Sequence, residues 1–214
     1  MAVTSLAGIE ELRRWGRPVV TTAEVAKRLH IAEPAASQLM SRLAALDAVV
    51  RVQRGRWLLR PDAPMLAVPY LALPHLAYAT GFWALASYGM IDQIPRAVDV
   101  ATGGRSRRLE VGDTVFELHH LEPRLLDGWV IRDEITVATP EKALFDAVYI
   151  RTARGVLDVR LPEVELPRGF NVARLQRWVS RIESPKVKFA SERSLDRIIE
   201  LTREGAGGGV QIAS

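Results

Sequence analysis

The chain has no cysteine, and this absence removes several classes of chemistry. A protein of 214 residues without cysteine has no disulfides, no cysteine nucleophile and no zinc site with thiolate ligands. It also lacks any apolar run that approaches the roughly 20 residues of a membrane-spanning helix. Its amino terminus lacks the basic-then-apolar pattern of a signal peptide. We therefore expect a cytoplasmic protein with no membrane partner.

Common catalytic motifs are missing as well. The sequence contains no Gly-rich phosphate loop, no G-x-S-x-G elbow and no H-E-x-x-H pair. The best candidate for a metal site is the pair His119 and His120, close to Glu117 and Glu122. Adjacent residues of a strand point to opposite faces, so both histidines could not bind one ion, and a site would need ligands from elsewhere. The sequence therefore predicts no metal site, no cofactor and no enzymatic activity.

The formal net charge is +4, but it is distributed unevenly. Residues 1–60 hold ten Lys or Arg and five Asp or Glu, residues 61–170 hold eleven and fifteen, and residues 171–214 hold eight and five. Neutralisation of phosphates supplies most of the sequence-independent affinity of proteins for DNA. This distribution favours nucleic-acid contact near the ends of the chain and another task for the acidic middle.

Two short helices are predicted near the amino terminus. Thr21 to Glu24 can start the first, because a Thr hydroxyl accepts a backbone N–H that the first helical turn leaves free. Glu33 and Pro34 start the second, since proline is tolerated where no N–H is needed. The apolar stripe predicted for this second helix consists of Ala36, Leu39, Met40, Leu43 and Leu46.

The other face of the second helix carries small and polar side chains. Such side chains suit insertion into the major groove of DNA, where bulky apolar ones could not lie against base edges. We therefore predict direct base contact from one helix face. Its residues are Ala35, Ser37, Gln38, Ser41 and Arg42.

A β-hairpin is predicted directly after this helix. Two β-rich runs, Val49–Val52 and Trp57–Leu59, flank a turn that contains Gly55. Arg54 and Arg56 at its tip would reach DNA phosphates or the minor groove. Two helices followed by two strands in this order are typical of a winged helix-turn-helix. The alternative is a helical hairpin followed by an ordinary surface hairpin with solvated arginines.

The stretch Arg60 to Pro64 holds two prolines and predicts a stiff linker. Beyond it we expect a helix over residues 81–88 and another that starts at Thr139-Pro140-Glu141. Between them lie β-rich runs at residues 97–101, 107–111, 115–118, 129–131 and 135–137. Strands bracketed by helices indicate an α+β fold. The sequence thus predicts a winged helix-turn-helix in residues 1–62 and a mixed α/β domain in residues 63–214.

Helical spacing returns after residue 171, and Gly205 to Gly209 predicts a flexible end. Basic residues recur along these predicted helices. Three arginines also follow Gly103-Gly104, where we expect an exposed hairpin. Solvated surface is one interpretation of both groups, and contact with DNA backbone or a partner protein is the other. The residues concerned are Arg105, Arg107, Arg108, Arg174, Arg177, Arg181, Lys186 and Lys188.

Four blocks of the middle region form a recognisable set. Tyr78-Ala79-Thr80 precedes ALASYGMIDQIP at residues 84–95, AVDVAT follows at 97–102, and VATPEKALFD occupies 137–146. Together the blocks resemble the AbiEi family of antitoxins, which occurs in bacterial abortive-infection toxin–antitoxin operons. The resemblance extends over residues 15–200, and Ala138 to Leu144 is its most specific part. We interpret the motif residues themselves as determinants of the fold, because Thr139, Pro140 and Glu141 suit a helix cap, a first turn and a dipole partner.

The resemblance implies two partners. One is double-stranded operator DNA, bound by an amino-terminal winged helix that represses the protein's own operon. The other is a co-encoded nucleotidyltransferase-like toxin, which the second domain would counteract without a stable complex. Because one recognition helix covers few base pairs, we expect two copies on inverted repeats, as a dimer or as monomers.

Two other functions stay open at this point. One is a plain winged-helix transcription regulator whose second domain senses a small molecule. The other is an enzyme, such as a nuclease fused to a DNA-binding domain. The enzyme ranks last, because the sequence shows no acidic cluster with a lysine at convincing spacing, and pairs such as Asp133-Glu134 are common in solvated loops.

Overall fold

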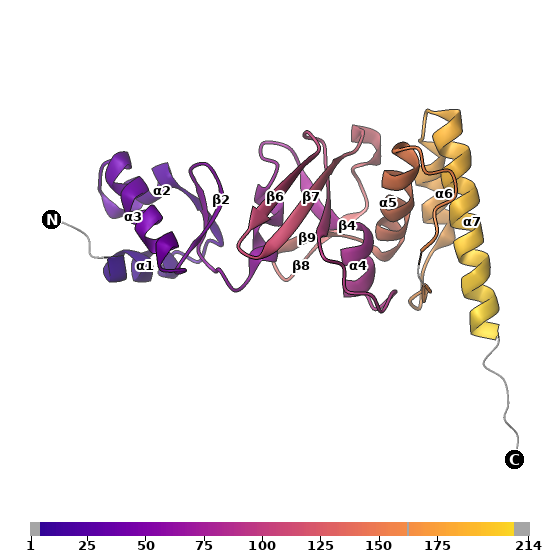
Figure 1. Cartoon of the computed structure of the whole chain (residues 1–214), viewed down its shortest axis with the longest axis horizontal. Helices are drawn as coiled ribbons and strands as arrows, with labels where there is room; N and C mark the ends of the chain where they lie inside the picture. Colours follow the sequence, from indigo (N-terminus) through magenta and orange to yellow (C-terminus); the bar gives the residue numbers. More distant parts are fainter. Residues whose placement is uncertain (1–4, 162, 208–214) are drawn as a thin grey trace, which may run out of the picture.

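Two β-sheets and two groups of helices follow one another along the long axis of the molecule (Figure 1). The computed structural model describes residues 5–161 and 163–207. One sheet has three strands and the other has six. Both helices and strands are therefore present in quantity, and the predicted α+β class is confirmed.

The amino-terminal region combines three helices with the smaller sheet. In chain order its elements are α1 (Ser5–Arg14), β1 (Val19–Thr21), α2 (Thr22–Leu29), α3 (Glu33–Ala45), β2 (Val50–Gln53) and β3 (Arg56–Leu58). The strands pair antiparallel in the order β1-β3-β2. α1 and β1 were not predicted. β1 has three residues, which is too short to show an alternating pattern in the sequence.

α2 begins at the predicted cap. Thr21 Oγ1 accepts the backbone N–H of Glu24 at 3.2 Å, and the Glu24 carboxylate accepts the backbone N–H of Thr21 at 2.7 Å. This capping box satisfies N–H groups that the first helical turn leaves free. Burial raises the pKa of Glu24, but hydrogen bonds from Thr21 and Arg17 outweigh it and lower that pKa below its ordinary value. The carboxylate is therefore held in its ionised, accepting form.

α3 begins at Glu33 with Pro34 in its first turn, as predicted. Leu46 was expected in its apolar stripe, but the helix ends at Ala45 and Leu46 is 71% exposed, so that assignment is wrong. Helical spacing brings a residue to the core only while the helix continues. The stripe that is buried consists of Ala36, Leu39, Met40 and Leu43.

The second region is built on the larger sheet. Its first half contains a 3₁₀ helix η1 (Pro64–Tyr70), β4 (Ala77–Thr80), α4 (Gly81–Ser87), β5 (Val98–Thr102), β6 (Arg107–Val111) and β7 (Thr114–His120). Its second half contains η2 (Pro123–Leu125), β8 (Trp129–Arg132), β9 (Ile135–Ala138), α5 (Pro140–Ala153), α6 (Val172–Ser180) and α7 (Pro185–Gly207). All five predicted β-rich runs are strands.

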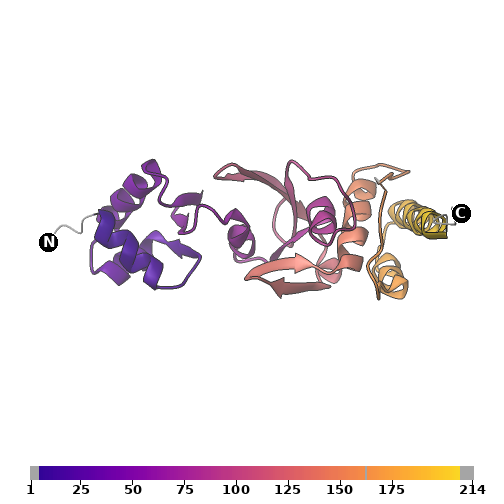
Figure 2. The same ribbon diagram turned by 90° about the horizontal axis from the view of Figure 1, so that it is seen from below.

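The strand order of this sheet is β6-β7-β5-β4-β9-β8, with parallel pairs β5–β7 and β4–β9. α4 and α5 pack together beside the curved sheet, and α6 and α7 lie beyond α5 at the carboxy-terminal end (Figure 2). α5 is consequently central, and every residue from 141 to 150 is buried. No helix among the described residues has the length and apolarity needed to cross a membrane.

The predicted hairpin after Gly103-Gly104 is not formed. β7 lies between β5 and β6, so residues 103–106 cross the end of β7 instead of turning back on β5. Ser106 Oγ accepts the backbone N–H of His120 at 2.8 Å, and His120 Nδ1 lies 2.9 Å from the Gly104 carbonyl oxygen. β6 instead forms its hairpin with β7. Strand order depends on distant pairings, which local turn signals do not contain.

Two apolar cores meet at the three-stranded sheet. Val20 and Trp57 pack with the three amino-terminal helices, whereas Val19 and Leu58 belong to the core of the second region. Successive strand residues point to opposite faces, which explains this division. η1 follows the predicted linker and contributes buried Leu66, Ala67 and Val68 to the second core. The chain thus crosses between the cores near residues 60–64, but the two regions pack against one shared sheet.

The carboxy-terminal helix differs from prediction at one apolar position. α7 continues to Gly207, so residues 205–207 of the expected flexible end are the last turn of this helix, and Gly208 and Gly209 lie outside the described residues. Leu201, expected to follow the apolar spacing of this helix, is exposed. The other apolar positions, Leu195, Ile198 and Ile199, are buried as expected.

Candidate nucleic-acid interface

The polar face of α3 is open to solvent. All five residues predicted to contact bases, Ala35, Ser37, Gln38, Ser41 and Arg42, are exposed. The opposite face is fixed by the buried apolar stripe, so the orientation of the helix follows from the same spacing that exposes these side chains. The structure therefore groups the five residues on one surface.

The hairpin β2–β3 has a two-residue turn made of Arg54 and Gly55. Gly55 has a φ of +72°, which favours glycine, and its carbonyl accepts the backbone N–H of Thr22 at 2.9 Å. That bond joins the turn to the start of α2. Arg54 is exposed at the tip, as predicted.

Arg56 does not lie at the tip. It is the first residue of β3, opposite Gln53, and it is half-buried. Its Nη1 lies 3.5 Å from the carbonyl oxygen of Tyr70. The predicted position of Arg56 is wrong because the turn closes in two residues, which leaves room for Arg54 and Gly55 alone. Its guanidinium is directed to the second region.

A hollow of about 480 Å³ lies between α3 and the hairpin. Ser37 and Ser41 of α3 line it, together with Arg51 and Arg54 of the hairpin. Arg51 was missed, although alternation along Val50-Arg51-Val52 already placed it on the face opposite buried Val52. Its guanidinium lies 5.8 Å from the centre of the Trp57 ring, a distance at which a cation is attracted to the aromatic face.

Strand β6 lies beside the hairpin. Gln53 Nε2 and Arg107 Nη2 donate to the same carbonyl oxygen, that of Leu71, at 2.5 and 2.6 Å. β2 and β6 are edge strands of their two sheets and are in contact. The bond to Leu71 thus holds the Arg107 guanidinium next to the hairpin. Arg105 and Arg108 are exposed, and Arg108 lies 3.8 Å from Glu110.

The basic residues of α6, of α7 and of the segment between them are at the opposite end of the molecule (Figure 1). Two of them are directed to carboxylates, because Arg174 lies 3.8 Å from Glu141 and Arg181 lies 2.6 Å from Asp127. Arg177 and Lys186 are exposed, and Lys188 lines a groove between the two helices. The structure therefore does not bring these cations together with α3.

The comparisons with known proteins give no function for either end of the molecule. No protein-family model matches the chain, and no curated protein matches it. The resemblance to AbiEi antitoxins consequently stays a prediction. It rests on blocks of the middle region, and the position of those residues in the structure bears on what they do.

The most specific of these blocks lies in the interior. Lys142 and Asp146 of α5 are fully buried and form an ion pair at 2.5 Å. Tyr78 and Thr80 of β4 donate to the other oxygen of Asp146, at 3.2 and 2.7 Å. Burial lowers the pKa of Lys142 and raises the pKa of Asp146. Burial and the carboxylate together raise the pKa of Tyr78 well above its ordinary value, so its hydroxyl remains a donor.

Glu141 of the same block is also buried, and its carboxylate accepts the backbone N–H of Asn171 at 3.1 Å. The contacts of this block are thus with the chain itself, which agrees with its interpretation as a determinant of the fold. Its buried charges were missed by sequence reasoning. The signal that could have found them is a Lys and an Asp four residues apart inside an apolar helix.

A second polar cluster surrounds His119. As predicted, His119 and His120 are on opposite faces, the first buried and the second exposed. His119 Nε2 lies 2.7 Å from Asp99 Oδ1, and Glu117 also lies within reach, so the three could supply ligand atoms within 4.8 Å of one another. Asp99, on β5, is the ligand from elsewhere that the sequence did not reveal.

The hydrogen bonds of His119 argue against a metal at this cluster. Arg154 Nη2 lies 2.8 Å from His119 Nδ1, and a guanidinium can only donate, so Nδ1 accepts and the ring proton is on Nε2. A histidine that binds a metal through Nε2 carries its proton on Nδ1, the position that Arg154 occupies. The arrangement is therefore an internal chain of hydrogen bonds from Arg154 through His119 to Asp99.

Proposed function

We propose that the protein binds double-stranded operator DNA through a winged helix-turn-helix formed by residues 5–62. In this proposal α3 enters the major groove, and the hairpin β2–β3 lies against the backbone. The chain order of three helices and three strands, with β3 between β1 and β2, supports this proposal. The observation that carries the proposal is the hollow between α3 and the hairpin, lined by polar α3 side chains and two arginines.

The charge of this hollow supports DNA as the ligand. Two arginines, Arg51 and Arg54, and one carboxylate, Glu33, line the hollow, and Arg42 is exposed on the same helix. Within the described part of the chain, the three arginines form no ion pair. Unpaired exposed arginines beside a helix with small polar side chains supply both kinds of contact that sequence-specific binding needs. Phosphate contacts orient the protein, and contacts to base edges provide specificity.

For the biological role, we propose an antitoxin that acts in the cytoplasm. It represses its own operon from inverted repeats and counteracts a co-encoded nucleotidyltransferase-like toxin, without a catalytic step of its own. This part is supported by the resemblance of residues 84–95 and 137–146 to AbiEi antitoxins. The acidic middle of the chain also suits a task other than DNA binding.

The DNA-binding half can be tested with the duplex upstream of the protein's own gene. Binding is measured by fluorescence anisotropy at several salt concentrations for the wild type and for the double variant R51A/R54A. Loss of two phosphate contacts would reduce the slope of log K against log salt by about 1.8, roughly 0.9 for each contact. The matched control is R177A/K186A, which removes two exposed cations at the other end. An unchanged slope for R51A/R54A would contradict the proposed interface.

The antitoxin half can be tested by co-expressing the full chain with the product of the neighbouring gene. Full-length variants are needed, because Val19 and Leu58 of the first region are part of the second core, and a fragment without them would expose that core. We expect growth to be restored by the wild type and by R51A/R54A expressed from an unrelated promoter. A toxic neighbour that neither protein counteracts would favour the plain transcription regulator.

A further inference from the structure

Strand β8 forms one edge of the six-stranded sheet. The strand at the other edge, β6, is in contact with β2 of the smaller sheet. β8 pairs with β9 on one side, and no second strand from the described part of the chain pairs with it. An edge strand of this kind presents backbone N–H and C=O groups that a strand of another molecule can bind.

The features that usually protect an edge strand are scarce in β8. Natural proteins place prolines, lysines or bulges at such edges. β8 contains no proline or lysine, and its register with β9 is continuous. Its one charged side chain, Arg132, packs over the Tyr88 ring, with 4.7 Å between the guanidinium carbon and the ring centre. Val130 and Ile131 are 42% and 70% exposed, so the edge is apolar as well as open.

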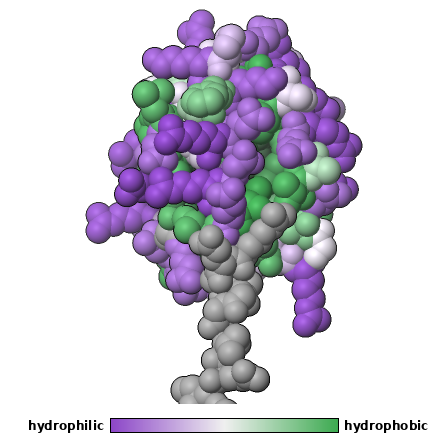
Figure 3. Space-filling view, turned by 90° about the vertical axis from the view of Figure 1, so that its right-hand side faces the viewer, coloured by the Kyte–Doolittle hydropathy of each residue, from purple (hydrophilic) through white to green (hydrophobic). Residues whose placement is uncertain are grey.

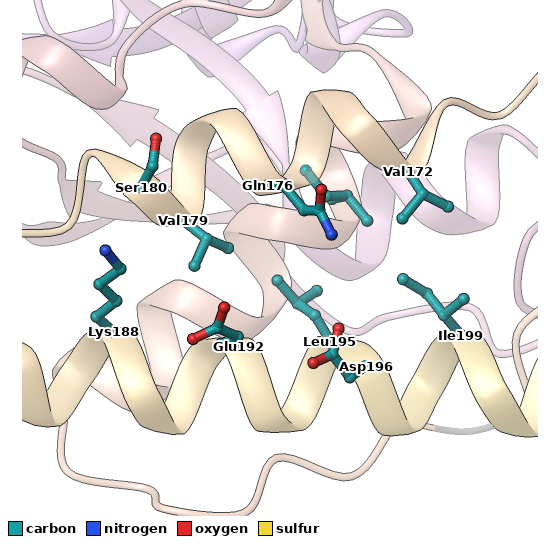
Figure 4. A pocket seen from close by; sticks show the side chains of 10 residues that line it. Val172, Gln176, Val179, Ser180, Lys188, Glu192, Leu195, Asp196 and Ile199 are labelled. Atoms are coloured by element: carbon teal, nitrogen blue, oxygen red, sulfur yellow. The ribbon is translucent and has the colours of Figure 1, made fainter.

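The end of the molecule formed by α6 and α7 differs from this edge. Hydrophilic side chains cover most of that face, with apolar ones between them (Figure 3). Apolar side chains of the two helices, among them Val179 and Leu195, are directed to one another (Figure 4) and are buried. They hold α6 against α7 and are not open to a partner.

β8 uses every second residue to bond β9. In an antiparallel pair, hydrogen-bonded residues alternate with residues whose N–H and C=O groups face the other way. Gly128, directly before β8, accepts the backbone N–H of Thr139 at 2.8 Å, which fixes the phase of this alternation. The two-residue turn at 133–134 agrees, because the residues that flank such a turn are hydrogen-bonded to each other. The N–H and C=O groups of Trp129 and Ile131 therefore point away from β9.

We infer that β8 pairs with β8 of a second copy of this chain. Antiparallel pairing about a two-fold axis at Val130 brings Trp129 of each copy opposite Ile131 of the other. The outward N–H and C=O groups of both strands then bond to one another, and the two six-stranded sheets become one continuous sheet. The same patch is used on both copies, as in most dimers of identical subunits.

The apolar side chains favour this register. Trp129 and Ile131 form aromatic and β-branched pairs across the contact, which stabilise antiparallel strands. Val130 meets its own copy on the other face, at a position without hydrogen bonds, where side chains approach most closely. A register with Ile131 opposite itself would instead place Trp129 beside Asp133 of the turn.

The charges at the ends of the contact are complementary. The turn after β8 carries Asp133 and Glu134, and the pairing places it beside the segment before β8 in the second copy. In that segment Asp127 lies 2.6 Å from Arg181, whose side chain is 40% exposed. Arg181 can therefore also meet Asp133 of the other copy. Each end of the contact brings an acidic turn to a cation.

The inference goes beyond the proposed DNA binding and does not depend on it. Interfaces of stable complexes involve about 20–30 residues on each side, so a contact made by one short strand should be weak without DNA. A two-fold axis also relates the two α3 helices of the dimer, which is the symmetry of an inverted repeat.

The first test is sedimentation velocity of the full-length protein without DNA, from low to high micromolar concentration. We expect a monomer–dimer equilibrium for the wild type. Ile131→Lys places a charge on the open edge and should weaken association at least tenfold. The matched control is Ile94→Lys, which changes an apolar side chain that is 92% exposed and lies outside the strands, and it should dimerise like the wild type.

The second test determines the register by disulfide cross-linking, because the chain has no cysteine of its own. The two copies of Val130→Cys would have their Cα atoms about 4.5 Å apart, within the roughly 4.4–6.8 Å that a disulfide spans. The two copies of Ile131→Cys are offset by two residues along the strands and lie beyond about 7 Å. We expect Val130→Cys to form a linked dimer much faster than Ile131→Cys or the exposed control Ile94→Cys.

Three results would overturn the inference. The first is a wild type that stays monomeric at every concentration, which would leave the edge for a strand of another protein. The second is equal dimerisation of I131K and the wild type. The third is cross-linking of V130C no faster than that of either cysteine control. Binding of I131K to a single operator half-site is measured in parallel and should match the wild type, so a failure of the DNA proposal would be seen separately.

Discussion

Helices α3 and α5 start alike and are used differently. Both have proline in the first turn and an acidic residue beside it, and their lengths are 13 and 14 residues. α3 packs one face and presents the other to solvent, whereas α5 is buried on all sides between the sheet and the last two helices. The more distinctive sequence belongs to α5, and the exposed polar surface belongs to α3. The motif in α5 therefore contributes to the fold. The candidate ligand surface is on α3, whose sequence is less distinctive.

The largest expected effect comes from breaking the buried pair of α5. Lys142→Ala or Asp146→Ala alone leaves one charge in the core without its partner, which costs about 3–5 kcal/mol of the free energy of unfolding. The double variant K142M/D146L, with apolar side chains of similar volume, should cost less than either single change. Urea unfolding of the three variants measures this. A double variant as unstable as the sum of the single ones would show that Lys142 and Asp146 do not act as a pair.

The matched changes on α3 should leave stability almost untouched. Gln38→Ala and Arg42→Ala remove exposed side chains, and surface substitutions usually alter the free energy of unfolding by less than about 0.5 kcal/mol. Their effect should appear in DNA binding instead. Loss of a good contact to a base edge costs about 1–3 kcal/mol of discrimination at particular base pairs. Affinities for operators with single base-pair changes measure it, and a uniform loss across all sequences would reassign these residues to the backbone.

The features that the sequence predicted correctly depend on residues close together in the chain. The starts of α2, α3 and α5 follow from Thr21, Pro34 and Thr139, because capping is decided within one helical turn. The exposed face of α3 follows from helical spacing, and five strands follow from their composition. These features depend on neighbours in the sequence.

Most of the errors concern features decided by residues far apart in the chain. The crossing from β5 to β6 depends on β7, which enters the sheet between them. The inward position of Arg56 depends on Tyr70 of the second region. Lys142 is buried because α6 and α7 cover α5, and a lysine in a helix gives no sign of such a cover by itself. Asp99 joins His119 through strand pairing alone.

The smallest predicted effect concerns the acidic residue at the start of each of these two helices. Glu33 begins α3 and lines the hollow in which a phosphate or base would lie, while Glu141 at the matching end of α5 is buried and accepts a backbone N–H. A carboxylate favours a helix start by about 0.3–1 kcal/mol but repels DNA phosphates. Glu33→Gln should therefore tighten operator binding a few-fold, most clearly at low salt, with a slight loss of stability. Glu141→Gln should leave operator binding unchanged and lower the urea midpoint. If Glu33→Gln weakened binding, the carboxylate would be a base contact, because an acidic side chain can accept a hydrogen bond from cytosine N4.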